Sequence, residues 1–477
     1  MSLDAASCYR AYQARDARFD GRFFVGVTST GIYCRPVCTA RLPKPEHCRF
    51  FPSAAAAEAA GFRPCLLCRP ESAPGLSTVR SGQRLAETAV RLMGEGCLED
   101  GGIEGLCARL GVTARHLRRV FKGRFGVSPV AFAQTQRLLL AKKLLTETSL
   151  PVTDVAFASG FSSLRRFNAL FSSRYRLSPT GLRARAAGES PATDAPGLEL
   201  GYRPPYDLAS LLAFLGARAV DGVEEVAGGS YRRTVRLSRH GAAHAGWIAV
   251  SDATGKNALR VTVSAGLMPV LPPVLARVSH LFDLDCDPLA IADGLGGLAA
   301  GHEGVRLPGA MDGFEVAVRA ILGQQVTVAA ARTLARRFAA AFGDPLDTPF
   351  RTLTTVFPDP GRVAALSVSA IASLGVIAGR ARAILALARA VRDGDVVLSP
   401  AAEPGATLDA LRALPGVGEW TAQYIAMRAL GWPDAFPHTD HGVKKALGEA
   451  EAKRVLQRAE VWRPWRAYAV MHLWRTL

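Results

Sequence analysis

Two short stretches near the start of the chain, GIYCRPVCTAR at residues 31–41 and GFRPCLLCRP at residues 61–70, decide how its first part folds. Each contains a pair of cysteines, and 26 residues separate the two pairs. Zinc binds four thiolates in a tetrahedron, and two cysteines separated by two or three residues let one turn supply two ligands. The spacing predicts a zinc site, and its alternatives are a purely structural zinc ribbon and a cluster without metal. The predicted ligands are Cys34, Cys38, Cys65 and Cys68.

Length and composition limit the class of protein. The 477 residues are too many for one hydrophobic core and suggest about three domains. With 49% hydrophobic and 21% charged residues, the chain is globular and is not a disordered basic tail. The start lacks the basic and apolar regions of a signal peptide, and no run of about 18 apolar residues predicts a transmembrane helix. Nine cysteines, an odd number, favour reduced thiols and a cytoplasmic protein.

The net charge points to a polyanionic partner. The chain has 58 Lys and Arg against 41 Asp and Glu, a formal surplus of +17. Nucleic acid is the simplest partner, and a ribosomal or membrane-surface role is the alternative. The surplus is +4 in residues 1–79, +11 in residues 80–187 and only +2 in residues 188–477. We therefore expect phosphate contacts to govern affinity in the first two-fifths of the chain.

An internal repeat of about 50 residues lies between two linker-like stretches, PESAPGLST at 70–78 and AGESPATDAPG at 187–197. The segment FKGRFGVSP at 121–129 recurs as FSSRYRLSP at 171–179. Each copy indicates a first helix, a glycine turn and a basic second helix, which is the helix-turn-helix pattern. The second helices are expected to begin after Thr113 and Ser162, which can cap them.

The two predicted second helices carry the candidate DNA contacts. A charged helix face is often only solvated, but two copies on one connecting helix, predicted at 136–145, favour DNA binding. The stretch PVTDVAFASGFSSLRRFNALFSSRYRLSPTGLR at 151–183 resembles the AraC-type DNA-binding domain, and the resemblance covers about residues 82–186. It implies two recognition helices in successive major grooves. The candidate contact residues are Arg118, Arg119, Arg165 and Arg166.

The remainder of the chain changes character along its length. Segments 230–237 and 258–264 have strand-like alternation, and the pattern is helical from about Met311. We therefore expect a small α/β region followed by an all-helical region.

Two features of the helical region bear on chemistry. LPGVG at 414–418 precedes an apolar helix predicted at 420–430, and a glycine hairpin there offers backbone N–H groups to a phosphate, although LPGxG also occurs as a simple turn. Asp440 follows downstream, and a lone acidic residue at such a place is most often a cap or a surface charge.

Residues 198–477 resemble the AlkA-type 3-methyladenine glycosylases of the helix-hairpin-helix superfamily. The segments that carry the resemblance are YRPPYDLASLLAFLGARAV at 202–220, MDGFEVAVRAILGQQVTVAAA at 311–331, LPGVGEWTAQYIAMRAL at 414–430 and PWRAYAVMHLW at 464–474. The resemblance implies that Asp440 is the catalytic aspartate. It also implies a base pocket, in which His441 replaces an aromatic residue beside the aspartate. The pocket residues are Phe214, Trp420, Tyr424, His441 and Trp474.

These residue types suit removal of an alkylated base. The target nucleotide must leave the stack, and electron-rich rings attract the positive charge of an alkylated purine. A carboxylate stabilises the oxocarbenium character that develops when the N-glycosidic bond breaks. Trp420 stands where lyase-active relatives have a Schiff-base lysine, which implies a monofunctional glycosylase. The expected DNA contacts are Gln325, in the place of an apolar duplex wedge, and Leu414, Gly416 and Gly418 of the hairpin.

The first part of the chain resembles the N-terminal domain of the Ada family. The resemblance rests on FFVGVTSTGIYCRPVCTAR at 23–41 and RFFPSAAAAEAAGFRPCLLCRP at 49–70, and covers roughly residues 4–75. It implies that Cys34 is both a zinc ligand and the acceptor of a methyl group from a DNA phosphotriester. Zinc keeps the thiol deprotonated, and methylation would change the formal charge of the site from −2 to −1. Weaker repulsion of phosphate should then tighten DNA binding.

The predicted fold is multidomain and mainly α with smaller α/β parts. The predicted domains are a zinc-bound α/β domain at 1–76, an all-α double helix-turn-helix domain at 80–187, a linker at 188–197, an AlkA-like α+β domain at 198–300 and a helical helix-hairpin-helix domain at 301–477.

The predicted function is DNA alkylation repair with a transcriptional response. The expected cofactor is one zinc ion, with no organic cofactor. The expected partners are double-stranded DNA, alkylated and promoter, and RNA polymerase, in a cytoplasmic, nucleoid-associated protein without a membrane partner. No cysteine precedes His-Arg, so no transfer from O6-methylguanine is expected. The alternative is a regulator whose glycosylase fold only grips DNA.

Overall fold

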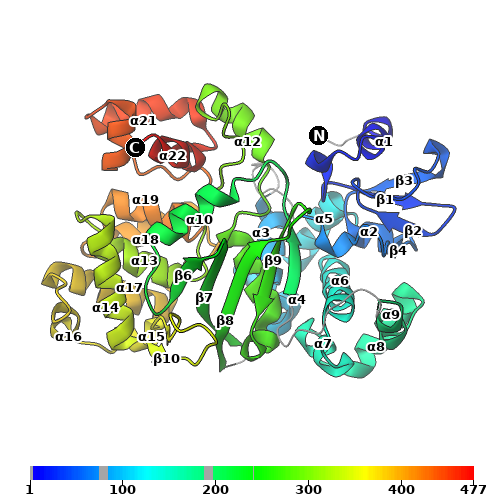
Figure 1. The fold of residues 1–477 in the computed structure, drawn as a ribbon, viewed down its shortest axis with the longest axis horizontal. Coiled ribbons are helices and arrows are strands. Elements are labelled where there is room, and N and C mark those ends of the chain that lie inside the picture. Colours follow the sequence, from blue (N-terminus) through cyan, green and yellow to red (C-terminus); the bar gives the residue numbers. More distant parts are fainter. Residues whose placement is uncertain (1–3, 75–83, 187–196, 240) are drawn as a thin grey trace. The chain divides into compact units, whose positions relative to one another are not determined.

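The computed structural model describes residues 4–74, 84–186, 197–239 and 241–477 (Figure 1). The predicted linker at 188–197 lies outside these residues except for its last position, and so does the second half of the linker-like stretch at 70–78. Two compact units form. The first unit comprises Met1–Pro204, Ala253–Ala276 and Leu284–Cys286, and the second comprises Pro205–Asp252, Arg277–Asp283 and Asp287–Leu477.

The first unit begins with a four-stranded sheet in the order β3-β1-β2-β4. Strands β2 and β4 are parallel, and Tyr33 pairs with Pro64, so that the next residues along the two strands, Cys34 and Cys65, come side by side. This register brings together the two cysteine pairs that are distant in sequence. The elements are α1 (Ala5–Gln13), β1 (Phe24–Val27), β2 (Ile32–Cys34), β3 (Cys48–Phe51), α2 (Ala54–Ala59), β4 (Arg63–Pro64) and the 3-10 turn η3 (Pro70–Ser72).

Seven helices follow, and the aromatic residues of the predicted repeat are buried among them. Phe121 and Phe125 are buried in one copy and Phe171 and Tyr175 in the other. Thr113 caps the first recognition helix, as predicted, by accepting from the backbone N–H of His116. The second recognition helix is capped by Ser163, so the prediction of Ser162 is wrong by one residue. The helices are α3 (Arg84–Gly94), α4 (Cys97–Leu110), α5 (Ala114–Phe125), α6 (Pro129–Glu147), α7 (Val152–Ala158), α8 (Leu164–Tyr175) and α9 (Pro179–Ala186).

The prediction of Ser162 as the cap of the second recognition helix failed because Ser162 and Ser163 are consecutive in the sequence. Both can accept from a helix N–H, and only the observed backbone shows which one adopts the extended conformation of a cap, which Ser163 does. The connecting helix α6 also extends further at both ends than the predicted 136–145, with Ser128 as its cap.

The mixed region contains the predicted strands. In the first unit, β5 (Gly197–Gly201) pairs antiparallel with β9 (Ala258–Val263). In the second unit, β6 (Glu224–Ala227), β7 (Ser230–Arg239) and β8 (Ala242–Asp252) form an antiparallel meander. The segments predicted at 230–237 and 258–264 correspond to β7 and β9. The accompanying helices are α10 (Leu208–Ala217), α11 (Leu271–Leu281) and α12 (Pro288–Leu295).

The last part of the second unit is helical, as predicted, apart from the two-residue strands β10 (Asp344–Pro345) and β11 (Thr355–Val356). Helix α13 is almost wholly buried, and it contacts α14, α17 and α19. None of the helices in the described part of the chain has the length and apolarity needed to cross a membrane. The helices are α13 (Gly313–Leu322), α14 (Val328–Phe342), α15 (Pro360–Ala364), α16 (Val368–Ala372), α17 (Ala378–Asp393), α18 (Pro404–Arg412), α19 (Glu419–Arg428), α20 (His441–Leu447), α21 (Ala452–Ala459) and α22 (Arg466–Arg475).

Candidate functional site

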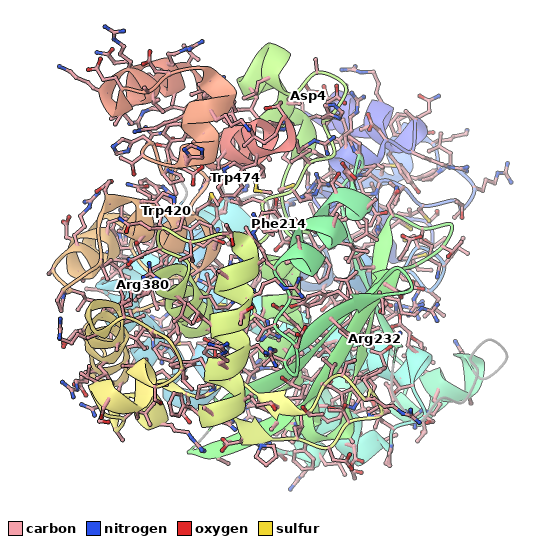
Figure 2. The ribbon with its side chains drawn as sticks, turned by 60° about the vertical axis from the view of Figure 1, so that its left-hand side comes forward. Asp4, Phe214, Arg232, Arg380, Trp420 and Trp474 are labelled. Atoms are coloured by element: carbon pink, nitrogen blue, oxygen red, sulfur yellow. The ribbon has the colours of Figure 1, made fainter. Side chains whose placement is uncertain are left out.

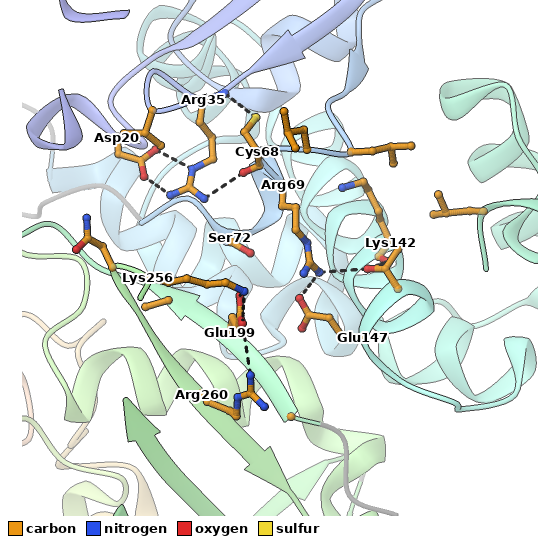
Figure 3. A pocket seen from close by; sticks show the side chains of 18 of the residues that line it. Asp20, Arg35, Cys68, Arg69, Ser72, Lys142, Glu147, Glu199, Lys256 and Arg260 are labelled. Carbon is orange, nitrogen blue, oxygen red and sulfur yellow. Dashed lines mark hydrogen bonds and ion pairs between the residues drawn. The ribbon is translucent and has the colours of Figure 1, made fainter. Parts of the chain in front are cut away.

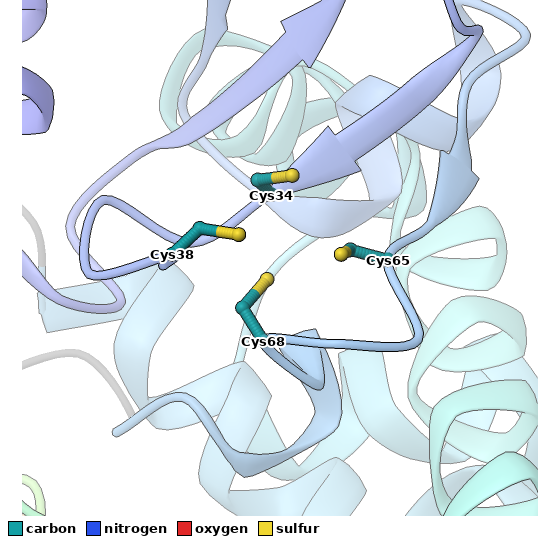
Figure 4. Close-up of side chains that lie close together, drawn as sticks. All are labelled: Cys34, Cys38, Cys65 and Cys68. Carbon is teal, nitrogen blue, oxygen red and sulfur yellow. The ribbon is translucent and has the colours of Figure 1, made fainter. Parts of the chain in front are cut away.

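The four predicted zinc ligands converge. Their sulfur atoms all lie within 4.8 Å of one another, and Figure 4 shows them pointing toward a common centre. Cys34 ends β2 and Cys65 follows β4, while Cys38 and Cys68 lie in the loops beyond. Four thiols at this spacing, with no other ligand type among them, fit the tetrahedral sulfur coordination of one zinc ion.

Backbone N–H groups around the cluster contact several of its sulfur atoms. The N–H of Arg35 donates to Cys68 Sγ at 3.3 Å. The backbone N–H groups of Ala40 and Cys68 interact in the same way with the thiols of Cys38 and Cys65. An N–H···S hydrogen bond withdraws electron density from a thiolate and helps to fix the position of its sulfur.

The Arg35 side chain fixes the loop between the first two ligands. Its guanidinium is paired with Asp20 and donates to the carbonyl oxygen of Cys68 at 3.2 Å (Figure 3). A cavity of about 880 Å³ opens beside these residues within the first unit, and it is also lined by Arg69, Lys142 and Glu147. The second cysteine pair is therefore held by charged groups as well as by its own strand.

The four predicted recognition-helix arginines are all exposed. Arg118 and Arg119 lie on α5, whose opposite face buries Leu117. Arg165 and Arg166 lie in the first turn of α8, next to its cap. Arg119 contacts the ring of His116 at 3.0 Å. Their exposure is compatible with contact to DNA, and this role of the four arginines stays a prediction.

In the second unit, the carboxylate of Asp440 accepts three hydrogen bonds at the predicted site. It is the N-cap of α20, and its Oδ1 accepts from the backbone N–H of Val443 at 2.9 Å. The indole N–H of Trp474 donates to Oδ1 at 2.9 Å, and that of Trp420 donates to Oδ2 at 2.8 Å. The simple alternative of a helix cap is thus correct, but a cap alone does not account for two tryptophan donors.

Aromatic rings line the space beside this carboxylate. Trp420 stacks on Tyr424 with 5.3 Å between ring centroids, and Phe214 stacks on Trp474 at 6.2 Å. Figure 2 shows Phe214, Trp420 and Trp474 near one another although they come from α10, α19 and α22. A cavity of about 390 Å³ is lined by Asp440, Trp420, Tyr424 and Trp474. His441 is exposed and does not line this cavity.

Two arginines behind the rings were not predicted. The guanidinium of Arg218 lies 3.8 Å from the centroid of Phe214, and Arg428 donates to the hydroxyl of Tyr424 at 2.9 Å. Burial alone would raise the pKa of Tyr424, but the positive charges of Arg428 and Arg218 lower it. Each arginine follows a predicted pocket aromatic by four residues, the spacing of neighbours on a helix face, and this signal could have found them.

The glycine hairpin has the backbone that its sequence predicts. Gly416 has a φ of +77°, and a Cβ there would lie 3.1 Å from the Cβ of Ala383, so both the backbone conformation and the tight contact disfavour a side chain. Gly418 is the N-cap of α19, and Leu414 is half-buried. Within this turn the N–H of Val417 donates to the carbonyl oxygen of Leu414 at 3.2 Å, and phosphate binding by the hairpin stays a prediction.

Gln325 lies near this hairpin. It is exposed with a φ of +52°, a left-handed conformation that is unfavourable for a non-glycine residue. The preceding residue, Gln324, was not predicted, and its side-chain amide donates to the carbonyl oxygen of Gly416 and to Thr421, each at 2.9 Å. The strained Gln325 is therefore held at a fixed distance from the hairpin.

Comparison with known families divides the chain into four matching parts. They are the metal-binding domain of Ada (residues 7–71), a helix-turn-helix domain (106–185), the AlkA N-terminal domain (197–312) and the HhH-GPD superfamily of base excision DNA repair proteins (318–464). We call residues 7–71 the Ada-type part and residues 106–185 the helix-turn-helix part.

Individual relatives extend this picture. DNA-3-methyladenine glycosylase 2 of Escherichia coli is 38% identical over 277 residues, which are 58% of this chain and 96% of the relative. A solved 3-methyladenine DNA-glycosylase from Archaeoglobus fulgidus is 20% identical, with a TM-score of 0.49 over 58% of this chain and 96% of that one. The probable bifunctional transcriptional activator/DNA repair enzyme AlkA of Mycobacterium tuberculosis is 41% identical over 491 aligned positions, which cover 100% of this chain and 97% of the relative. The chain therefore belongs to the family of bifunctional transcriptional activator/DNA repair enzymes in which Ada-type metal-binding and helix-turn-helix domains precede an AlkA-type glycosylase.

Proposed function

We propose that the second unit removes alkylated purines such as 3-methyladenine from double-stranded DNA by hydrolysis of the N-glycosidic bond. The observation that carries this proposal is the Asp440 carboxylate, held by two indole N–H groups at the edge of an aromatic cavity. The hairpin amides and Gln325 bind the DNA backbone and fill the place of the flipped nucleotide. The damaged base enters the aromatic cavity, as it must leave the stack to react.

Asp440 acts on the sugar and not on the base. As the glycosidic bond breaks, positive charge develops on the sugar, and a fixed carboxylate stabilises it or orients the attacking water. The hydrogen bonds from Trp420 and Trp474 hold both carboxylate oxygens before the substrate arrives, so that no reorientation is needed in the transition state.

The reaction stops at the abasic site. Trp420 occupies the place of the lyase lysine, and its indole N–H is engaged with Asp440. Without an amine there, no Schiff base can form with the sugar, and the enzyme is a monofunctional glycosylase.

The test is base release from methylated duplex DNA by the full-length protein. We expect free 3-methyladenine, intact strands before alkaline treatment, and no protein–DNA adduct after borohydride reduction. Release that persists undiminished in Asp440→Asn would sink the assignment of Asp440. A borohydride-trapped adduct would refute the monofunctional assignment alone. A protein that binds the DNA without releasing any base would support the regulator with a non-catalytic glycosylase fold.

The second proposed activity is stoichiometric methyl transfer from a DNA methylphosphotriester to Cys34. The match of residues 7–71 to the metal-binding domain of Ada and the place of Cys34 as the first cysteine of the Cys-Arg-Pro-x-Cys motif support this assignment. The thiolate attacks the methyl carbon, the carbon–oxygen bond of the ester breaks, and the phosphodiester leaves with the electron pair. Cys38, Cys65 and Cys68 hold the zinc ion, which keeps the Cys34 sulfur deprotonated when bound.

Methylation removes one negative charge next to DNA, and the exposed arginines of α5 and α8 bind promoter DNA. The protein is consequently a sensor of its own substrate, and it acts on the nucleoid with RNA polymerase as the partner in activation.

Mass analysis of the Cys34 peptide tests the transfer. We expect a gain of about 14 Da, the mass of one CH₂, after incubation with methylated DNA. A gain on another cysteine peptide would contradict the assignment.

A further inference from the structure

Helix α2 of the Ada-type part touches the helix-turn-helix part at the end of the first recognition helix. Its N-cap, Ser53, is buried and donates its hydroxyl to the carbonyl oxygen of Phe125 at 2.7 Å, and Phe125 is the last residue of α5. Gly126 follows with a φ of +76°, and a Cβ there would lie 3.1 Å from the Cβ of Ala56. The Ada-type part and the helix-turn-helix part are therefore packed closely together at this point, with α2 against the backbone at the end of α5.

One carboxylate in the same helix joins three elements. Glu58 is 4% exposed, and its Oε1 accepts from the hydroxyl of Tyr33 on β2 at 3.1 Å. Its Oε2 accepts from the hydroxyl of Thr135 on α6 at 3.0 Å. The hydroxyl of Tyr175, the last residue of α8, donates to Oε1 at 3.4 Å. The carboxylate thus links the strand that ends in Cys34 to the connecting helix and to the second recognition helix.

The stability of α2 gives no reason for a glutamate at this position. The helix is otherwise alanine, and every residue from Ala54 to Glu58 is buried. Burial raises the pKa of Glu58 to about 7, which reflects the cost of placing a carboxyl group here. Such a group is retained only where hydrogen bonds compensate for lost hydration, and two of its three donors belong to the helix-turn-helix part.

A second polar contact lies on the same face of α6. Lys142 follows Thr135 by seven residues, which is two helical turns, and it is 2% exposed. Its Nζ is 2.6 Å from both carboxylate oxygens of Glu71 and 3.4 Å from the carbonyl oxygen of Cys65, a zinc-ligand residue. Figure 3 shows Lys142 beside Arg69, which is paired with Glu147 near the end of the same helix. The contacts of Lys142 and the Arg69–Glu147 ion pair therefore connect α6 to residues at or next to the cysteine cluster.

We propose that Glu58 couples the cysteine cluster to the connecting helix α6 and the second recognition helix α8, so that the two parts bind DNA as one body and a change at Cys34 alters the stability of α6 and α8. The path runs from Cys34 to the adjacent Tyr33, through the shared carboxylate, to Thr135 and Tyr175. The response to methylation rests on the proposed acceptor role of Cys34, whereas the coupling itself does not.

The test compares hydrogen exchange of the backbone amides in residues 129–147 and 164–175 of the full-length zinc-loaded protein. The variant Thr135→Val/Tyr175→Phe removes two hydroxyls and leaves the Tyr33–Glu58 hydrogen bond intact. Thr135→Ser keeps the hydroxyl and serves as the conservative variant. Glu46→Gln is the matched control, because Glu46 is exposed and has only a 4.0 Å ion pair with Lys44. The cluster is perturbed in two ways, by zinc removal with a chelator and by methylation with methyl iodide.

In the wild type, in Thr135→Ser and in Glu46→Gln, we expect zinc removal to speed the exchange of both segments by about tenfold. In the double variant, both segments should exchange faster with zinc bound and respond to its removal by less than about threefold. Equal responses in wild type and double variant, or no response of the wild type in either segment, would overturn the coupling. In the methylation arm, the mass of the Cys34 peptide is recorded in the same samples. Lack of uptake would refute the acceptor role and leave the zinc arm to decide the coupling, while uptake without a change in exchange would overturn the proposal.

Discussion

The cysteine cluster and the aromatic cleft both meet damaged DNA, but they are built in different ways. The four sulfurs come from a segment of 35 residues, and one strand register brings them together. The cleft takes side chains from α10, α19 and α22, and Phe214 and Trp474 are 260 residues apart in the chain. In the cluster, one of the four predicted zinc ligands, Cys34, is also the proposed methyl acceptor. In the cleft, the carboxylate proposed to act is held by side chains that can be changed one at a time.

The two regions also differ in charge. The first 187 residues carry a surplus of +15, whereas the rest of the chain carries +2. We therefore expect phosphate attraction to act mainly in the first 187 residues, and the cleft to depend on hairpin amides and local contacts. Variants that affect one region and spare the other are the sharpest test of this division.

The largest effect is expected at a zinc ligand. Cys38→Ala should abolish zinc binding and methyl uptake and should unfold the Ada-type part, because a structural zinc contributes an apparent binding free energy of about 10–16 kcal/mol. Base release should stay at the wild-type rate. Zinc content, the mass of the Cys34 peptide and released 3-methyladenine are measured on the same preparation. Cys48→Ala is the control, since Cys48 lies outside the four-sulfur cluster, and a zinc-retaining Cys38→Ala protein would contradict the assignment.

The next effect is the converse change in the cleft. Asp440→Asn keeps an oxygen that can accept from Val443 and Trp474, but its NH₂ group would face the indole N–H of Trp420. We expect a loss of about 10²–10³ in the single-turnover rate of base release, which is typical of removing one electrostatic group from a transition state. Methyl uptake at Cys34 should not change. A loss in both activities would mean that the two regions are not independent.

Two buried groups should give the regions opposite responses to pH. Burial raises the pKa of Glu58 from 4.5 to about 7, so the folded state binds the proton more tightly, and stability falls as the pH rises from about 4.5 to 7. The shift at Glu58 corresponds to about 3 kcal/mol. Burial lowers the pKa of His472, on α22, from 6.5 to about 4, so the stability of this helix falls as the pH decreases through this range.

Local hydrogen exchange, corrected for the intrinsic pH dependence of the chemistry, measures both responses in one protein. We expect the peptide containing α2 to lose protection between pH 5 and pH 7, and the peptide containing α22 to lose it between pH 6.5 and pH 5. Glu58→Gln and His472→Gln should each remove only their own response. Parallel responses in the two peptides would show that stability is global and not regional.

What the sequence could predict follows the same division between local and distant contacts. The cysteine spacing, the strands β7 and β9 and the Thr113 cap depend on neighbouring residues, and they were predicted. Asp440 and its aromatic neighbours required a resemblance, because no local pattern places residues 214 and 474 together. Arg218, Gln324 and Glu58 were missed, because the role of each depends on contacts that the sequence alone does not show.

The smallest and most discriminating effect concerns the two tryptophans. Oδ1 of Asp440 has a second donor in the backbone N–H of Val443, whereas Oδ2 accepts, among the residues that the structure describes, from Trp420 alone. Trp420→Phe should therefore slow base release by about tenfold with little change in affinity for DNA, while Trp474→Phe, which keeps an aromatic ring in the same way, should cost less. Single-turnover rates and binding to duplex DNA with an abasic site separate a positioning role from a loss of stacking. If the two variants lose rate equally, the tryptophans serve only as walls of the pocket; if Trp420→Phe alone loses rate, orientation of the second carboxylate oxygen is part of the chemistry.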